Sequence, residues 1–93
     1  MRKLIWASLA LLDFDDLQNY IGLDNPSAAH RVTRRIVEAA VSLRGNPFLG
    51  RSLSNTDLRA FVVSGTPYMI VYRASQEAVS IARIWHNRRD WKV

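Results

Sequence analysis

The chain has 93 residues, of which 48% are hydrophobic and 23% are charged, and this is the composition of an ordinary globular domain. We therefore expect a single domain, residues 1–93, with a core of modest size. The absence of cysteine excludes a disulfide framework and most zinc sites, and it is compatible with a reducing compartment.

Positive charge is concentrated in the second half of the chain. Residues 1–42 carry five basic and five acidic residues, whereas residues 43–93 carry eight basic and three acidic residues, which accounts for the net charge of +5. Seven of those eight bases are arginine, the side chain best suited to bidentate contacts with phosphate or carboxylate. The sequence therefore indicates an anionic partner, either nucleic acid or an acidic protein segment. The alternative is that the positive charge only keeps the protein soluble and marks no partner.

The first twelve residues, MRKLIWASLALL, have the basic start and apolar run of a signal peptide. The run is short, meets acidic residues without a clear cleavage site, and cannot span a bilayer. We expect instead a short strand, Lys3 to Trp6, and a helix that begins near Ser8 as its N-cap. Apolar residues at helical spacing define the buried side of this helix: Ala10, Phe14, Leu17 and Ile21.

Three acidic residues, Asp13, Asp15 and Asp16, occupy the first two turns of this helix. Neighbouring carboxylates can bind a metal or act in catalysis, but no histidine or further acidic residue is spaced to join them. Contact with solvent and with the positive end of the helix dipole are therefore the favoured roles. We expect neither a metal site nor a cofactor.

A turn at Gly22 to Asn25 is expected to lead into a second helix, in which Asn25 is the N-cap and Pro26 the first helical residue. The buried stripe of this helix is Ala29, Val32, Ile36, Ala40 and Leu43. Its other side carries Arg31, Arg34 and Arg35. Gly45 stands where a C-cap glycine belongs. The two apolar stripes predict a helical hairpin that packs on a sheet.

The rest of the chain has the composition of a loop followed by three strands. Residues 47–57 form the loop, in which Gly50 permits an unusual backbone turn. The predicted strands are Leu58 to Val63, Tyr68 to Arg73 and Ala78 to Ile84. Their short connections favour antiparallel pairing throughout. The predicted fold is α+β, in the order β-α-α-β-β-β, with the helical hairpin packed on a small, mainly antiparallel sheet.

Short motifs follow one another along this order. The first helix carries Asp13-Phe14, Leu17 and Tyr20-Ile21, and the second opens with Asn25-Pro26 and Ala28-Ala29. Next come Asn46-Pro47, Gly50-Arg51 and Leu58-Arg59. The last are Tyr68-x-Ile70-x-Tyr72-Arg73, Arg83-Ile84-Trp85-His86 and Arg88-Arg89-Asp90-Trp91. Together these motifs cover nearly the whole chain, and they resemble the RelE/ParE superfamily of type II toxins, most closely its ParE-like branch.

The resemblance implies a cytoplasmic toxin that arrests growth and is neutralised by a cognate antitoxin, usually through a flexible acidic segment. It also implies no membrane partner, and contact with operator DNA only through the antitoxin complex. A basic domain with an exposed helical hairpin suits an acidic partner that folds on binding. The candidate antitoxin contacts are Arg31, Arg34 and Arg35.

Members of this superfamily either poison DNA gyrase or cut mRNA on the ribosome. Cleavage of RNA without a metal needs a general base, a general acid and cations that stabilise the transition state. His86 is the candidate acid or base, because its ordinary pKa lies near neutrality. The full candidate catalytic set is His86, Arg83, Arg51, Arg59 and Tyr72. Tyr72, Trp85 or Trp91 could stack on a base.

Two features favour the gyrase interpretation. Met69 follows Tyr68 at a position where the ribosome-dependent nucleases of this superfamily often have an arginine. In a regular strand, Arg83 and His86 point to opposite faces, and they converge only if the strand ends or bulges near Ile84. We therefore expect an inhibitor of DNA gyrase. A RelE-like ribosome-dependent endoribonuclease is the alternative, and a second is an inactive homologue that only binds antitoxin and tunes operon repression.

The C-terminal end of the chain is the candidate surface for the cellular target. Its residues lie at or beyond the last strand, where little core remains to pack against: Trp85, Arg88, Arg89, Trp91 and Lys92. Three residues at this end also have structural interpretations. Trp85 could belong to the core, His86 could form a hydrogen bond inside the fold, and Arg83 could be a satisfied sheet arginine.

Overall fold

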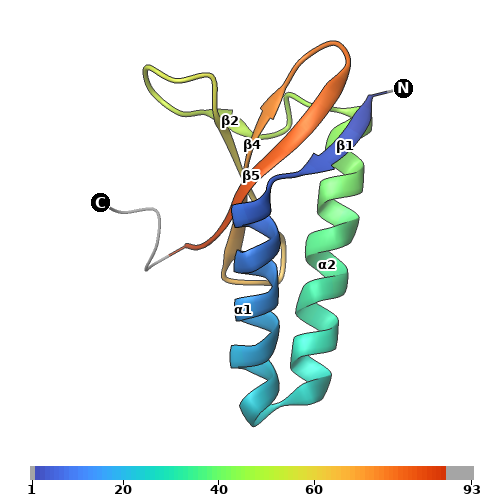
Figure 1. Ribbon diagram of the computed structural model, residues 1–93, viewed down its shortest axis with the longest axis vertical. Coiled ribbons are helices and arrows are strands. Elements are labelled where there is room, and N and C mark those ends of the chain that lie inside the picture. The colour runs from blue at the N-terminus through green and yellow to red at the C-terminus, as the bar shows by residue number, and fades with distance from the viewer. Residues whose placement is uncertain (1, 88–93) are drawn as a thin grey trace.

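A computed structural model describes residues 2–87, which form a helical hairpin packed on one face of a five-stranded sheet (Figure 1). The elements are β1 (Lys3–Trp6), α1 (Ser8–Asp24), α2 (Pro26–Gly45), β2 (Arg51–Ser52), β3 (Arg59–Val62), β4 (Tyr68–Ala74) and β5 (Ala78–His86). The predicted α+β fold and its element order are confirmed, and β2 is an additional two-residue strand inside the segment expected to be a loop.

The strands are arranged in the order β1-β5-β4-β3-β2. Strands β2 to β5 pair antiparallel, as their short connections predicted. Strand β1 pairs parallel to β5, so the expectation of antiparallel pairing throughout is wrong for this strand. The helical hairpin separates β1 from the later strands, and a long connection of this kind permits parallel pairing. The sheet therefore joins the two ends of the chain at its β1–β5 pair.

The buried stripe predicted for α1 is confirmed. Ala10 and Leu17 are buried, and Phe14 and Ile21 pack against the same core. The predicted N-cap is wrong by one residue, because Ala7 occupies the cap position and no side chain forms a capping hydrogen bond there. Alanine can take this position because packing of the apolar stripe holds the helix in place.

A single residue, Asn25, links the two helices. The turn expected at Gly22 to Asn25 is wrong, since residues 22–24 continue α1. Asn25 is extended, with φ −154° and ψ 91°, and its Oδ1 accepts a hydrogen bond from the N–H of Ala28 at 3.1 Å. The predicted capping by Asn25, with Pro26 as the first helical residue, is confirmed. The link lies at the end of the hairpin that projects away from the sheet (Figure 1).

Helix α2 buries every residue of its predicted stripe. Its predicted end is wrong, because Gly45 is the last helical residue and Asn46 is the cap, with φ −147° and ψ 77°. The chain therefore leaves α2 in an extended direction, and a glycine in the left-handed conformation is not used there.

The core lies mainly between the hairpin and the sheet, and a smaller apolar cluster lies on the other face. In this second cluster Ala60, Met69 and Val71 are buried under Leu53, Leu58 and Trp85. Residues 68–72 of β4 are therefore buried on both faces, as their predicted central position requires. Neither helix in the described part of the chain is long and apolar enough to cross a membrane.

Candidate functional site

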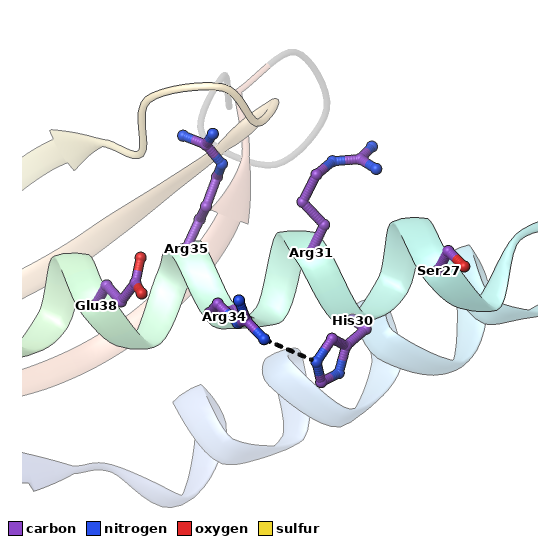
Figure 2. A pocket seen from close by; sticks show the side chains of 6 residues that line it. All are labelled: Ser27, His30, Arg31, Arg34, Arg35 and Glu38. Atoms are coloured by element: carbon purple, nitrogen blue, oxygen red, sulfur yellow. Dashed lines mark hydrogen bonds between the residues drawn. The ribbon is translucent and has the colours of Figure 1, made fainter.

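The basic side of α2 is the first candidate site. Arg31, Arg34 and Arg35 line a surface hollow of about 400 Å³ together with Ser27, His30 and Glu38 (Figure 2). Arg31 and Arg35 point to one side of the helix, and His30 and Arg34 point to the other (Figure 2). Arg34 Nη2 lies 3.4 Å from His30 Nε2, and because a guanidinium cannot accept, the imidazole is the acceptor. The three arginines thus share one helix but form two separate groups.

Arg35 also has a structural contact. Its Nη1 donates to the carbonyl of Ser64 at 3.2 Å, in the turn between β3 and β4. Gly65 follows with φ +78°, and a Cβ atom at this position would lie 3.0 Å from Arg35 Nη1. The turn therefore needs glycine both for its left-handed backbone and for the space that the guanidinium occupies. Arg35 holds this turn against α2.

The three arginines have no acidic partner within residues 2–87. No carboxylate there forms an ion pair with them, although Glu38 lines the same hollow. Like charges at neighbouring positions of a helix repel one another, and an anionic ligand would relieve that repulsion. This side of α2 is therefore suited to carboxylates or phosphates.

Arg83 is held by α1. Its Nε lies 2.8 Å from Asp13 Oδ2 and its Nη2 lies 3.0 Å from Asp13 Oδ1. Asp13 Oδ2 also accepts a hydrogen bond from the N–H of Ile84 at 3.0 Å. Strand β1 ends at Trp6, opposite Ile81, so Asp13 supplies an acceptor to β5 beyond the end of its neighbouring strand. The solvent and dipole role expected for Asp13 is therefore wrong.

His86 lies on the opposite face of the sheet from Arg83. It pairs with Tyr68, which belongs to the core beneath the helices, whereas Arg83 pairs with Val71 of the second cluster. The His86 and Tyr68 rings meet edge to face, with centroids 5.3 Å apart. The bulge in β5 falls between Ile81 and Arg83, before both candidate residues, so it does not bring them together. The strand positions of Arg83 and His86 therefore face opposite sides of β5, as their parity predicts, while the Arg83 guanidinium reaches Asp13 on α1.

Tyr72 is fully buried beside the loop that follows α2. Its hydroxyl donates to the carbonyl of Pro47 at 2.7 Å and accepts from the N–H of Gly50 at 2.9 Å. Burial raises the pKa of Tyr72 above its ordinary value, against the smaller opposing effects of the Gly50 hydrogen bond and the Arg59 charge. A Cβ atom at Gly50 would lie 2.6 Å from the Tyr72 hydroxyl oxygen, so glycine is needed here for close approach and not for an unusual turn.

Arg59 holds the same loop. Its Nη1 donates to the carbonyl of Gly50 at 2.8 Å, and its guanidinium lies 4.8 Å from the centroid of the Phe48 ring. Arg51 is exposed in β2 and pairs with Ala60 of β3. The structure therefore brings Arg59 and Tyr72 together, but around the backbone of a loop that both of them stabilise.

The candidate catalytic residues do not converge on one place. Arg59 and Tyr72 lie at residues 47–50, Arg83 lies at Asp13, and His86 lies at the other end of β4, beside Tyr68. General acid–base cleavage needs the acid, the base and the cationic groups within reach of one phosphate. Among the described residues, these candidates therefore do not form one acid–base centre.

The candidate target surface is described only in part. Trp85 packs against the second apolar cluster, and its ring lies 5.8 Å from the Arg83 guanidinium carbon. The other candidates lie outside the described residues: Arg88, Arg89, Trp91 and Lys92.

Sequence reasoning missed an apolar surface on α1. Leu9, Leu12, Tyr20 and Leu23 are 55% to 84% exposed on the side away from the core, and we call them, with Asp16 in their midst, the outer stripe. Their spacing of three and four residues is a helical period, so the signal was present in the sequence. A row of solvent-facing apolar side chains on one helix is a candidate surface for contact with another molecule.

Comparisons with known proteins agree with this architecture. A chromosomal ParDE toxin–antitoxin system from P. aeruginosa contains a chain of the same fold, with TM-score 0.82 and 24% identity over 92% of this chain and 96% of that one. The putative toxin Y4kP of Sinorhizobium fredii is 34% identical over 90 residues, which are 97% of this chain and 93% of the relative. Toxin RelE2 of Caulobacter vibrioides is 39% identical over 89 residues, 96% and 99% of the two chains.

The family assignment rests on the sequence as well as on the fold. The sequence model of one protein family, described as the ParE toxin of the type II toxin–antitoxin system parDE, matches residues 4–91, nearly the full length of the chain. The ordered motifs, the fold and the two relatives that are named toxins point the same way. The chain therefore belongs to the ParE toxin family, within the RelE/ParE superfamily of type II toxin–antitoxin systems.

Proposed function

We propose that the chain is a cytoplasmic toxin whose cognate antitoxin binds across the helical hairpin and contacts Arg31, Arg34 and Arg35. Membership of a toxin–antitoxin family supports an antitoxin partner. The three arginines support an acidic one, because no carboxylate among residues 2–87 neutralises them. Operator DNA is contacted only through the antitoxin complex.

Binding of purified antitoxin to the Arg31→Glu variant tests this surface. Arg31 makes no hydrogen bond within the described part of the chain, so its replacement should leave the fold intact and weaken antitoxin binding about tenfold. Lys3→Glu makes the same change of charge on β1, beside the C-terminal end of α2 and far along that helix from Arg31, and should have a smaller effect. Equal effects of the two variants would mean that only net charge matters and would remove α2 from the proposal.

For the cellular target, the proposal is inhibition of DNA gyrase by binding. The observation that carries it is that the candidate catalytic residues have separate partners, since Arg83 is paired with Asp13 while His86 packs against Tyr68. A nuclease would need these groups around one phosphate. An inhibitor needs only a surface, which is the candidate C-terminal surface with Trp85.

Thymidine and methionine incorporation after induction of this chain alone in a bacterial host separates the targets. Gyrase inhibition should lower DNA synthesis within minutes and protein synthesis later. An immediate fall in protein synthesis would overturn the gyrase proposal in favour of ribosome-dependent mRNA cleavage. Unchanged growth would leave only the inactive homologue, which binds antitoxin and tunes operon repression.

Ribosome-dependent cleavage of mRNA is the second candidate, because one relative is named a RelE toxin. His86 supports it, since it lines an open hollow with Gly65, Thr66, Pro67 and Asn87. If this candidate holds, His86→Ala should abolish cleavage and preserve antitoxin binding. Loss of both would assign a structural role to the contact between His86 and Tyr68.

A further inference from the structure

We propose that part of the antitoxin binds as a short extended strand in a hollow between α2 and β3. This strand pairs with the outer edge of β3 at Val62, and it inserts an aliphatic side chain between Phe61 of β3 and Ala39 of α2. The binding mode rests on the proposed antitoxin partner. It adds the conformation and the side-chain class of the antitoxin segment that lies next to the α2 arginines.

The outer edge of β3 is only partly covered by β2. Strand β2 pairs with residues 59–60 alone, and the same register continued backwards would place Leu49 opposite Val62. The chain has turned away before this point, and the N–H of Leu49 donates to the carbonyl of Asn46 at 3.2 Å. Among residues 2–87, no strand therefore lies beside Val62 on this edge of the sheet.

The backbone of Val62 points to this open edge. The N–H of Val63, the next residue, donates to the carbonyl of Tyr68 on the β4 side at 2.9 Å. On the outer side, the carbonyl of Leu58 accepts from the N–H of Leu53 at 2.9 Å. Successive residues of a strand alternate in this direction, so Val62 turns its N–H and C=O outward, as Leu58 does. No backbone group of the described residues pairs with them there, and such an edge can accept a strand from another chain.

The hollow lies beside this edge, on the face of the sheet that the helices cover, and has a volume of about 280 Å³. Phe61 and Val63 line it from the sheet, and Ala39 and Leu49 add apolar atoms from α2 and from the loop that follows it. In an added strand, the residue opposite Val62 points to the other face, and its two neighbours point into the hollow. The site therefore selects an extended segment with aliphatic side chains at alternate positions.

The hollow is continuous with the basic side of α2. Arg35 and Glu38 line both this hollow and the one that contains Arg31. Arg31, Arg35 and Ser42 are separated by four and seven residues, so they follow one another along one side of the helix. Arg31 and Arg35 point together to one side of α2 (Figure 2). An acidic segment that pairs with these arginines is therefore followed directly by the part that enters the hollow.

Binding of purified antitoxin to variants of Ser42 tests the hollow. Ser42 is exposed and lines the hollow, and its hydroxyl donates to the carbonyl of Glu38 one turn earlier at 3.0 Å. Ser42→Trp fills the hollow and should weaken binding about tenfold or more, whereas Ser42→Ala should bind like the wild type. Gln76→Trp places the same bulky side chain in the exposed connection before β5 and should also bind like the wild type. Equal affinity of Ser42→Trp and the wild type overturns the proposal.

Hydrogen exchange tests the pairing at Val62 without a substitution. The Val62 amide should exchange rapidly in the free chain and roughly tenfold or more slowly in the antitoxin complex, because the added strand accepts its hydrogen bond. The Val63 amide is paired with Tyr68 and should exchange slowly in both states, so it serves as the internal control. A Val62 amide that exchanges equally fast with and without antitoxin overturns the added strand.

Arg31→Glu distinguishes failure of this strand from failure of the whole antitoxin surface. If both proposals hold, Arg31→Glu and Ser42→Trp each weaken binding. If Arg31→Glu weakens binding while Ser42→Trp and the Val62 amide show no response, the hollow is unused and the antitoxin surface on α2 stands. If both variants bind antitoxin with the affinity of the wild type, both proposals fail.

Discussion

The hydroxyl of Tyr72 joins β4 to the loop that follows α2. It satisfies the carbonyl of Pro47 and the N–H of Gly50, both at a buried site. A buried polar group without a partner costs about 1–3 kcal/mol, so this hydroxyl fixes the path of the chain between the helical hairpin and the small strand β2. The hydroxyl therefore uses both its donor and its acceptor inside the fold. Tyr72 contacts the loop after α2, and not His86 or Arg83.

Removal of this hydroxyl tests whether its role is structural. Tyr72→Phe should lower the free energy of unfolding by about 1–3 kcal/mol, measured by urea denaturation, because two backbone groups lose their partner. Ile81→Val is the matched control, since it removes one buried methyl group and should cost about 1 kcal/mol without touching a hydrogen bond. If Tyr72→Phe abolished growth inhibition while an equally destabilised control retained it, Tyr72 would have a catalytic role after all.

The raised pKa of Tyr72 predicts a pH dependence of stability. Above the ordinary value of 10.0, the unfolded chain releases a proton that the folded chain retains. The unfolded state then binds fewer protons, so the free energy of unfolding falls as the pH rises. The contribution should be complete below about pH 10 and lost as the pH passes the folded pKa. The wild type should therefore lose more stability than Tyr72→Phe between about pH 9 and 11, and parallel curves for the two proteins would contradict this.

Between elements, Asp13 connects α1 to the C-terminal half of β5. It pairs with Arg83 and accepts the N–H of Ile84, where β5 extends beyond its neighbour β1. Asp13 is partly buried, with 17% of its side chain exposed, whereas Asp57 in the Arg73 pair is 73% exposed. Burial weakens screening by solvent, so the first pair should contribute more to stability.

Substitution of the two aspartates measures this difference. Asp13→Ala should cost about 2 kcal/mol in thermal or urea unfolding, because Ile84 and Arg83 both lose a partner. Asp13→Asn keeps an oxygen for the Ile84 N–H and should cost about half as much. Asp57→Asn at the exposed pair should cost less than about 1 kcal/mol. The Ile84 amide should also exchange faster in Asp13→Ala, and unchanged exchange there would show that Asp13 does not hold the strand.

Most elements of the fold are predictable because their signals are local. The apolar stripes of both helices and the composition of β3, β4 and β5 depend on neighbouring residues alone. The parallel pairing of β1 with β5 is not local, because it joins residues 3–6 to residues 78–81. The two-residue strand β2 is too short to carry a periodic signal. Gly22 is helical because it lies against Ala29 of the second helix, and this contact overrides the low helix propensity of glycine.

The site was predictable to a smaller degree. The sequence spacing of Arg83 and His86 predicted that they face opposite sides of the strand, because successive side chains of a strand alternate between its two faces. The pairing of Arg83 with Asp13 joins residues 70 positions apart, and nothing in either segment indicates it. The arrangement of Arg31 and Arg35 apart from Arg34 follows from helical spacing, but the contact of Arg35 with Ser64 requires the β3–β4 turn to be in place.

At the scale of the whole molecule, the net charge of +5 and the arginines of α2 act together on association with an acidic partner. Charge at a distance accelerates encounter, and salt screens it over about 10 Å at 0.1 M. The association rate constant with purified antitoxin, measured by stopped flow, should therefore fall roughly tenfold between 50 and 500 mM salt. Dissociation should change far less, because it depends on contacts at short range.

Comparison of charge variants locates this effect on the molecule. Arg31→Glu should slow association at low salt and reduce its dependence on salt, because it reverses a charge at the contact surface. Lys3→Glu lowers the net charge equally from β1 and should slow association less. If both variants slowed association to the same degree, the total field of the protein would guide the antitoxin, and the position of the α2 arginines would matter only after encounter. An association rate that did not respond to salt would mean that apolar contacts, such as those of the outer stripe, determine recognition from the start.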